Sequence, residues 1–400
     1  MKWIFTALLM VSLEAGAQTQ QQVDKIKSKD YINAIIKNVG NKRIVALGED
    51  THGTAEFYEL RAAITKRLIE EKGFTTLVLE NPHEDMQAVQ DSLQHTSLDS
   101  LMRRHLFSIY QTRQMKEFLA WLKGQARKKI KLAGCDDSYR ELLPEMMMES
   151  VQKLKLPVLL NPVTEFKERQ VKGGDPDIKY GLATYTLLNR IDSLYQNQKK
   201  RDAKFEELLF HAKTAYIFYY RFSRKEAVSR DEIMGERISY YAKDPNQKII
   251  VWAHSGHIAK YAWLQDELGL MGATVYKYFP KDYFAIGLSS ANGHYSYITN
   301  RFINGDHVFD DTLHTTAFRE TKDSSWNQLL AQNKSKSFVL DLTKITKADS
   351  AAFAEPRKLR IQGYRKESAT YNEFYPICLP RMYDMILFLR NTTATDGLFK

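Results

Sequence analysis

The 400-residue chain has only two cysteines, Cys135 and Cys378, and its longest apolar stretch is short. Two cysteines cannot define a disulfide framework, and because both lie in apolar segments we expect buried free thiols. Zinc motifs with paired cysteines are absent as well. A membrane-spanning helix needs about 20 predominantly apolar residues, so we expect no stable insertion into a membrane.

A concentrated basic surface is also missing. The chain carries 58 Lys and Arg against 48 Asp and Glu, giving a net charge of +10, but the two signs are mixed throughout. No basic stripe alternates with aromatic residues, so we expect no nucleic-acid partner. With 44% hydrophobic and 26% charged residues, the composition is that of an ordinary globular protein.

The first residues have the build of a secretory signal peptide. Met1 and Lys2 precede an apolar stretch from Trp3 to Leu13, and the small residues of Ala15-Gly16-Ala17 follow. A basic start, a brief apolar core and a small-x-small site are typical of a cleaved signal. We therefore expect residues 1–17 to be removed and residues 18–400 to be exported, to the periplasm or the medium.

Short apolar runs alternate with helical patterns along the chain. The runs cover residues 43–47, 75–79, 130–134, 248–252, 283–289, 337–342 and 383–389, and helical periodicity covers 55–72 and 112–129. Alternation of this kind predicts an α/β fold with a mainly parallel sheet and flanking helices, here as a single domain. Residues 161–177, rich in Pro, Gly and charge, predict a loop. Residues 178–242 predict a helical insertion that covers the cleft.

Two of the runs end in similar polar turns. Gly48-Glu49-Asp50-Thr51-His52-Gly53 follows the first run, and Ala253-His254-Ser255-Gly256-His257 follows the fourth. In open α/β sheets ligands bind at the carboxyl ends of parallel strands. The two turns are therefore expected to face one cleft and to bring Glu49, His52, His254 and His257 together, as in an enzyme.

Three further charged residues belong with these turns. Glu80 and Asp136 each follow an apolar run, where a protein core has no use for a carboxylate. Arg61 falls on the apolar face of the helix at 55–72 and must be paired there, because an unpaired buried charge costs several kcal/mol. Two interpretations stay open for Arg61: a structural ion pair with Glu49 or Glu80, or an electrophilic group aimed into the cleft.

A serine hydrolase is not indicated. The sequence has no Gly-x-Ser-x-Gly elbow, and Ser255 lacks the strand–elbow–helix context. Glu49 and His52 lie in a turn framed by glycines, so they are not a helical zinc signature. Histidines and carboxylates do suit a divalent metal. We expect chemistry without a cofactor, with a divalent metal as the alternative.

At these positions the chain resembles the erythromycin esterase family. The matching segments are Gly48 to Gly53, Arg61, Gly73-Phe74, Glu80, Gly134-x-Asp136, Arg230-Asp231-x-x-Met234, Val251 to His257 and Leu379-Pro380-x-x-Tyr383-Asp384. The resemblance spans roughly residues 41–393. It implies that the active-site residues are Glu49, His52, Arg61, Glu80, His254 and His257, and that a macrolide lactone or another ester is hydrolysed without a serine nucleophile. The family more often has Asn at position 255, and the departure to Ser255 affects either how the second turn is held or the substrate preference. We expect Ser255 and Asp136 to contact the substrate.

Hydrolysis by water needs a base with a pKa near neutrality, and histidine supplies one. We assign His52 as that base and expect Glu49 or Glu80 to orient its ring. Arg61, or His254 when protonated, is expected to stabilise the oxyanion, with His257 assisting the leaving group or placing the substrate. The rival hypotheses are a haem- or metal-binding protein that uses the same histidine-rich cleft, and a phosphatase or other metal hydrolase.

Overall fold

The computed structural model describes residues 19, 21–137, 142–170, 177–261, 269–303, 306–309, 312–319, 325–346, 353–367 and 374–399. The expected signal peptide at 1–17 lies outside the described residues. Both cysteines are free, Cys135 fully buried and Cys378 partly buried. Among the described residues, no helix has the length and apolar character required to cross a membrane.

One large sheet organises the molecule. Six parallel strands lie side by side in the order β13 (Met385–Thr392), β6 (Tyr283–Tyr297), β2 (Ile44–Leu47), β5 (Ile249–Trp252), β3 (Thr76–Pro82) and β4 (Lys131–Asp136). Beyond β13, β10 (Ser337–Asp341) and β1 (Lys27–Ser28) extend the sheet with antiparallel strands. The antiparallel strand β9 (His314–Ala317) pairs with the far half of β6. The prediction of a mainly parallel α/β sheet is confirmed, and all seven predicted runs contain strands.

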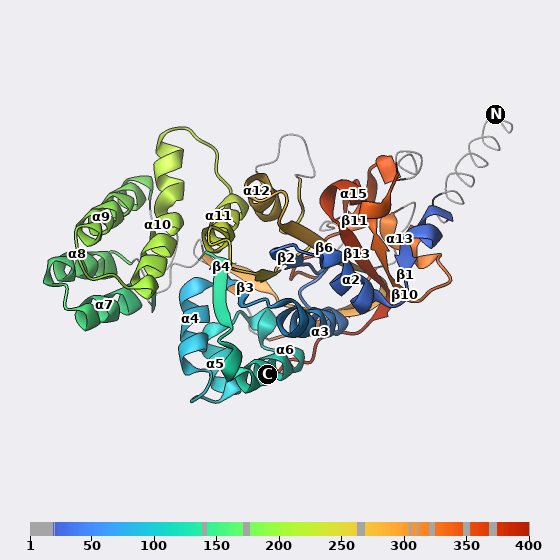
Figure 1. Ribbon diagram of the computed structural model, residues 1–400, viewed down its shortest axis with the longest axis horizontal. Helices are drawn as coiled ribbons and strands as arrows, with labels where there is room; N and C mark the ends of the chain where they lie inside the picture. The colour runs from blue at the N-terminus through green and yellow to red at the C-terminus, as the bar shows by residue number, and fades with distance from the viewer. Residues whose placement is uncertain are drawn as a thin grey trace.

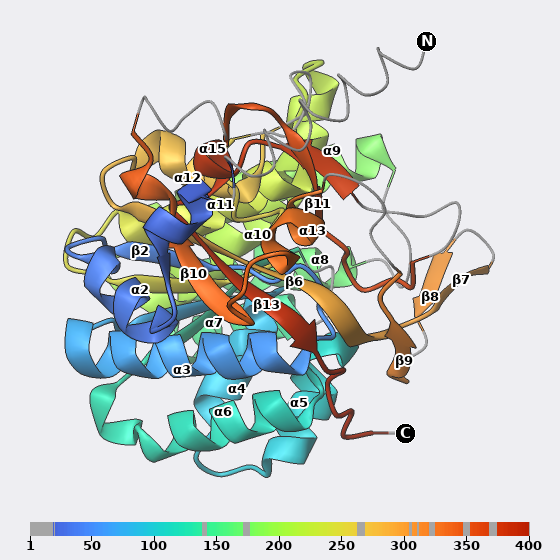
Figure 2. The same cartoon turned by 90° about the vertical axis from the view of Figure 1, so that its right-hand side faces the viewer.

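Helices cover both faces of this sheet. On one face lie α2 (Tyr31–Val39), α3 (Ala55–Lys72), α4 (His83–Ser92), α5 (Leu98–His105) and α6 (Arg113–Gly124); on the other lie α11 (Arg230–Ala242), α12 (Met271–Tyr278), α13 (Trp326–Ala331) and α15 (Leu379–Met382) (Figure 2). Successive β2 residues enter opposite cores: Val45 and Leu47 pack on the α3 side, and Ile44 and Ala46 on the α11 side. Because both faces are covered, the strands are apolar throughout.

Four further helices form a lobe with its own apolar core: α7 (Leu142–Leu154), α8 (Pro157–Glu168), α9 (Ile178–Gln196) and α10 (Ala203–Ser223). Figure 1 shows the lobe beyond the edge strand β4, at the side of the sheet. The insertion therefore begins at residue 142 instead of 178. The α11 helix, which we assigned to the insertion, packs against the sheet. Coverage of the cleft by the lobe stays a prediction.

The predicted loop at 161–177 is wrong over its first part, which belongs to α8. Pro162 lies inside this helix, where a proline costs about 3 kcal/mol. Burial of Leu159, Val163 and Phe166 in the lobe core outweighs that cost. Residues 171–176 of the predicted loop lie outside the described residues.

The small hairpin of β11 (Arg357–Arg360) and β12 (Phe374–Ile377) packs beside α13, and the described residues of these strands pair only with each other. The strands β7 (Asn300–Ile303) and β8 (Asp306–Phe309) form a second hairpin.

Candidate active site

The two polar turns meet at the carboxyl edge of the sheet, as expected. Because β2 and β5 are adjacent and parallel, Leu47 lies opposite Trp252 and the turns begin side by side. The backbone N–H of Ser255 donates to the carbonyl of Glu49 at 2.8 Å. Gly48 is required for this approach, since a Cβ at that position would lie 2.5 Å from Ser255 Oγ. The two turns therefore form a single packed unit at this edge of the sheet.

Glu49 links the histidine of its turn to the buried arginine. Its Oε1 lies 2.9 Å from His52 Nδ1, and its Oε2 lies 2.5 Å from Arg61 Nη2. Glu49 and Arg61 have no exposed surface, whereas His52 retains 5% exposure. A carboxylate that accepts from Nδ1 fixes the tautomer of the ring and leaves Nε2 to act as a base. The sequence-predicted role of Glu49 as the orienting group agrees with this geometry.

Arg61 is a structural partner of Glu49 and does not line the cleft. Its guanidinium carbon lies 4.7 Å from the ring centre of Tyr58 and 4.8 Å from that of Trp252. Burial alone would lower the pKa of Arg61, but the Glu49 carboxylate raises it above its ordinary value. The expectation of a buried ion pair is confirmed. The alternative of an electrophile aimed at the substrate is wrong, because both aromatic rings and Glu49 enclose the guanidinium.

Glu80 is the centre of a second set of contacts. Its Oε2 accepts from the backbone N–H of His254 at 2.8 Å, and its Oε1 lies 3.2 Å from His257 Nε2 and 3.6 Å from Arg230 Nη2. Burial raises the pKa of Glu80, but the positive charge of His257 and Arg230 outweighs it and holds the pKa well below its usual range. Glu80 therefore stays ionised and orients the second turn through the backbone of His254.

His257 lies between two carboxylates. Besides Glu80, it contacts Asp231 through Nδ1 at 2.8 Å. Burial alone would lower the pKa of His257, but Glu80 and Asp231 raise it to about 10. The pKa of Asp231 is in turn lowered, because His257 outweighs the effect of burial. At neutral pH His257 is thus a cation with both ring nitrogens engaged, which excludes it as a general base.

His254, unlike His257, is held as a neutral ring. Its ring lies between those of His52 and His257, with centres 5.1 and 5.9 Å away. Burial and the two neighbouring histidines lower the pKa of His254 to about 3. Its Nε2 lies 3.4 Å from the carbonyl of Asp50, which can only accept, so this nitrogen carries the proton. With its pKa lowered in this way the ring is neutral near pH 7, which argues against the predicted role of a protonated His254 at an oxyanion.

Asp136 anchors a cation that we did not assign to the site from the sequence. Arg230 donates to Asp136 through Nε at 2.7 Å and Nη2 at 2.5 Å. The side chain of Asp136 is 5% exposed, whereas that of Arg230 is 46% exposed. A bidentate pair of this kind fixes the plane of the guanidinium, although the Arg230 side chain stays half-exposed. Arg230 and Asp231 open α11, so adjacent opposite charges at a helix start were the signal available in the sequence.

Ser255 supports the second turn and does not reach into the cleft. Its side chain is 1% exposed, and its hydroxyl donates to the carbonyl of Leu288 at 3.3 Å. Its own carbonyl accepts from the hydroxyl of Tyr383 at 3.0 Å. The expected contact of Ser255 with substrate is therefore wrong, because the Gly48 backbone and β6 cover the hydroxyl.

Within the described residues, no group of three or more His, Cys, Asp or Glu has an arrangement that could hold a metal ion. The acids and histidines at the cleft instead pair with one another and with Arg61 and Arg230.

The fold is that of an α/β protein, and the candidate site lies at the carboxyl ends of its parallel strands, where ligands bind in open α/β sheets. The erythromycin esterase family model matches residues 69–392, and the chain belongs to this family. The protein is accordingly a carboxylic ester hydrolase. The curated relative erythromycin esterase type II of Escherichia coli is 24% identical over 315 residues, which cover 66% of this chain and 73% of the relative.

Solved structures share the fold. A Bacillus cereus protein superposes with a TM-score of 0.80 at 20% identity, covering 96% of this chain and 99% of its own. A mutant erythromycin esterase in its open conformation gives a TM-score of 0.66 at 16% identity, covering 92% of this chain and 95% of its own. At such identities the likeness concerns the architecture alone.

Proposed function

We propose that the protein hydrolyses a carboxylic ester or macrolactone by activating water with His52, without a serine nucleophile. The observation that carries this proposal is the pair of contacts at Glu49, which leaves His52 Nε2 as the basic nitrogen of the site. The other two histidines are fixed as a neutral ring and as a cation. A histidine whose second ring nitrogen is held by a buried carboxylate is an arrangement suited to general-base catalysis.

In the proposed reaction, His52 Nε2 accepts a proton as water attacks the ester carbonyl. Glu49 stabilises the imidazolium, and Arg61 lies against the second oxygen of the Glu49 carboxylate. The same proton then passes from His52 to the leaving alkoxide, which restores the base. A general base contributes about 100- to 10,000-fold, so electrostatic stabilisation must supply the rest.

We assign the stabilisation of the oxyanion to Arg230 in place of Arg61 and His254. The Arg230 side chain is half-exposed, and its guanidinium is held by Asp136 and lies 3.6 Å from Glu80. His257 and Glu80 act as positioning residues, because their ion pair holds the second turn through the His254 amide. The comparisons above give no support to a haem- or metal-binding protein.

The test is a panel of aryl esters, aliphatic lactones and macrolides, with the products identified by mass spectrometry. We expect hydrolysis of at least one class, with His52→Gln as the inactive control and Ser255→Ala retaining turnover. Metal analysis and assays after chelation test the divalent-metal alternative: activity that disappears with the metal and returns on its addition contradicts the metal-free proposal. Absorption spectra after haem addition test the binding-protein alternative.

We also propose that the protein is exported to the periplasm or the medium. The support is the basic start, the apolar core and the small-residue site of residues 1–17. Sequencing of protein recovered from its native cell is expected to find Gln18 or a neighbour at the amino terminus. An intact Met1 on the mature protein contradicts export by this route.

A further inference from the structure

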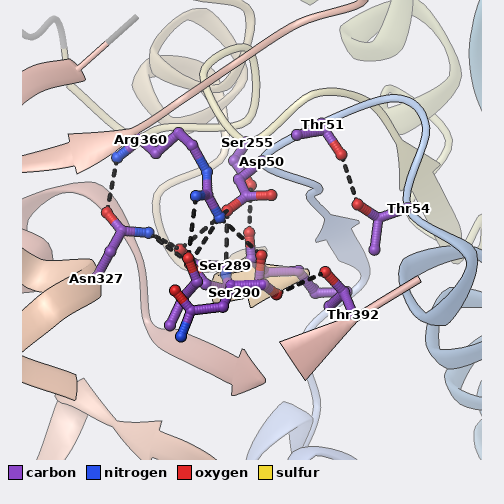
Figure 3. A network of polar contacts seen from close by, with 12 residues as sticks. Asp50, Thr51, Thr54, Ser255, Ser289, Ser290, Asn327, Arg360 and Thr392 are labelled. Carbon is purple, nitrogen blue, oxygen red and sulfur yellow. Dashed lines mark hydrogen bonds and ion pairs between the residues drawn. The ribbon is translucent and has the colours of Figure 1, made fainter. Parts of the chain in front are cut away.

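The turn that carries Glu49 and His52 has a second acid, Asp50, whose carboxylate points away from them. Figure 3 shows it directed at Ser289, Ser290 and Arg360. Asp50 Oδ2 accepts from the Ser290 backbone N–H at 3.0 Å and the Ser289 hydroxyl at 3.2 Å, and it lies 3.1 Å from Arg360 Nη2. Asp50 and Arg360 have no exposed surface. In a fully buried pair each charge depends on the other for stabilisation.

Arg360 comes from β11, 310 positions along the chain, and is held from several sides. Its backbone N–H donates to Asn327 Oδ1 at 2.9 Å, and its Nη2 donates to the carbonyl and the hydroxyl of Ser290, each at 2.7 Å. Its guanidinium carbon lies 3.6 Å from the ring centre of Phe318. The guanidinium is therefore fixed before any substrate binds, and it presents a preorganised charge to Asp50.

Fixing Asp50 also fixes three groups of the active site. Glu49 precedes Asp50 directly, and His52 follows two residues later in the same turn. The Asp50 carbonyl accepts from His254 Nε2, which sets the tautomer of that ring. On the far side, Gly53 packs so tightly on β6 that a Cβ would lie 1.8 Å from the Ser296 carbonyl oxygen. The turn is thus held at Asp50 and at Gly53, on either side of His52.

We propose that Arg360 is a positioning residue for the ester hydrolysis proposed above. It neutralises and orients Asp50, and so holds residues 48–53 with His52 aligned to Glu49 and with His254 in its Nε2–H tautomer. The β11–β12 hairpin is consequently a working part of the active site, although its strands are not joined to the main sheet. The kinetic part of the test rests on the proposed function, and the spectroscopic part does not.

The experiment compares Arg360→Gln and Arg360→Lys with wild type on the best ester of the panel, at a temperature where each variant is folded. A small misalignment of reacting groups costs up to about 100-fold. We expect Arg360→Gln to lower kcat by about 10- to 100-fold with KM within about twofold of wild type. Lysine keeps the charge but lacks the planar fork, so Arg360→Lys is expected to recover part of the loss.

Arg43→Gln is the matched control. Arg43 precedes β2 at its opposite end and pairs with Asp282 at 2.7 Å, so this variant breaks an Arg–Asp pair without touching the turn. We expect it to lose stability and keep kcat. A loss of kcat in Arg43→Gln equal to that in Arg360→Gln overturns the proposal, since it indicates a general effect of destabilisation.

Nuclear magnetic resonance of ¹⁵N-histidine-labelled protein, with the His254 signals assigned by a His254→Asn variant, supplies a readout independent of activity. We expect the His254 ring signals of Arg360→Lys to depart from the Nε2–H pattern of wild type. If Arg360→Gln does not fold, the kcat and the His254 ring signals of Arg360→Lys alone decide whether Arg360 positions the turn. Unchanged ring signals together with wild-type kcat overturn the proposal. If wild type hydrolyses no ester, the proposed function fails, and the ring signals still decide whether Arg360 positions the turn.

Discussion

Replacement of Arg61 by methionine tests the electrostatic basis of the site most directly. Arg61 and Glu49 are fully buried and form an ion pair at 2.5 Å. Methionine fills a similar space between Tyr58 and Trp252 but leaves the Glu49 carboxylate without its counter-charge. Breaking a buried ion pair on one side costs about 3–5 kcal/mol. Loss of the two cation–π contacts adds about 1–2 kcal/mol in total.

A loss of about 4–7 kcal/mol is a large part of the 5–15 kcal/mol that stabilises a typical domain. Urea unfolding of Arg61→Met and wild type at pH 7, followed by tryptophan fluorescence and circular dichroism, measures this loss of stability. The double variant Glu49→Gln with Arg61→Met removes both charges of this buried pair, so its free energy of unfolding is expected to return to within about 2 kcal/mol of wild type. Its kcat is expected to stay low, because a neutral amide does not stabilise the His52 imidazolium.

Arg67→Met on the same helix is the control, because Arg67 pairs with Glu71 at the surface and such pairs contribute about 0–1 kcal/mol. The reasoning is refuted if Arg61→Met loses no more stability than Arg67→Met. It is also refuted if the double variant is as unstable as Arg61→Met alone, since the cost would then come from packing.

Three further predictions concern single side chains. His52→Gln is expected to lower kcat by about 100-fold or more and to unfold at nearly the same urea concentration as wild type, with Glu49 and Glu80 variants losing less activity; a folded variant with wild-type turnover rules out His52 as the base. His257 has a folded pKa of about 10 against an ordinary 6.5, so its contribution to stability is complete below pH 6.5 and is lost as the pH rises to 10. Urea titrations across this range are expected to show a steeper decline for wild type than for His257→Gln, and parallel curves contradict the assignment. The buried Tyr110 hydroxyl has no hydrogen-bond partner among the described residues, so Tyr110→Phe is expected to leave the free energy of unfolding unchanged or about 1 kcal/mol higher. Tyr195→Phe, which removes a hydroxyl bonded to the Asp202 backbone, is expected to lose about 1 kcal/mol, and an equal loss in Tyr110→Phe contradicts the prediction.

The sequence by itself determined the sheet and the edge at which the two polar turns meet. The β2 and β5 runs are apolar throughout because helices cover both faces of the sheet, and that pattern can be read without coordinates. Their polar turns lie at one edge because parallel strands end on the same side. The pairing of Arg61 was also predictable, since its position on an apolar helix face demanded a counter-charge.

Tertiary structure alone decided which charged groups at this edge of the sheet are exposed and which are buried. Arg61 and Arg230 are both arginines next to acidic strand ends, yet aromatic rings enclose the first while the second is half-exposed. The states of His254 and His257 diverge because one ring is buried among histidines and the other lies between two carboxylates. Contacts such as Asp50 with Arg360 join residues 310 positions apart. Local sequence patterns carry no information about such partners, because burial and distance exist only once the chain has folded.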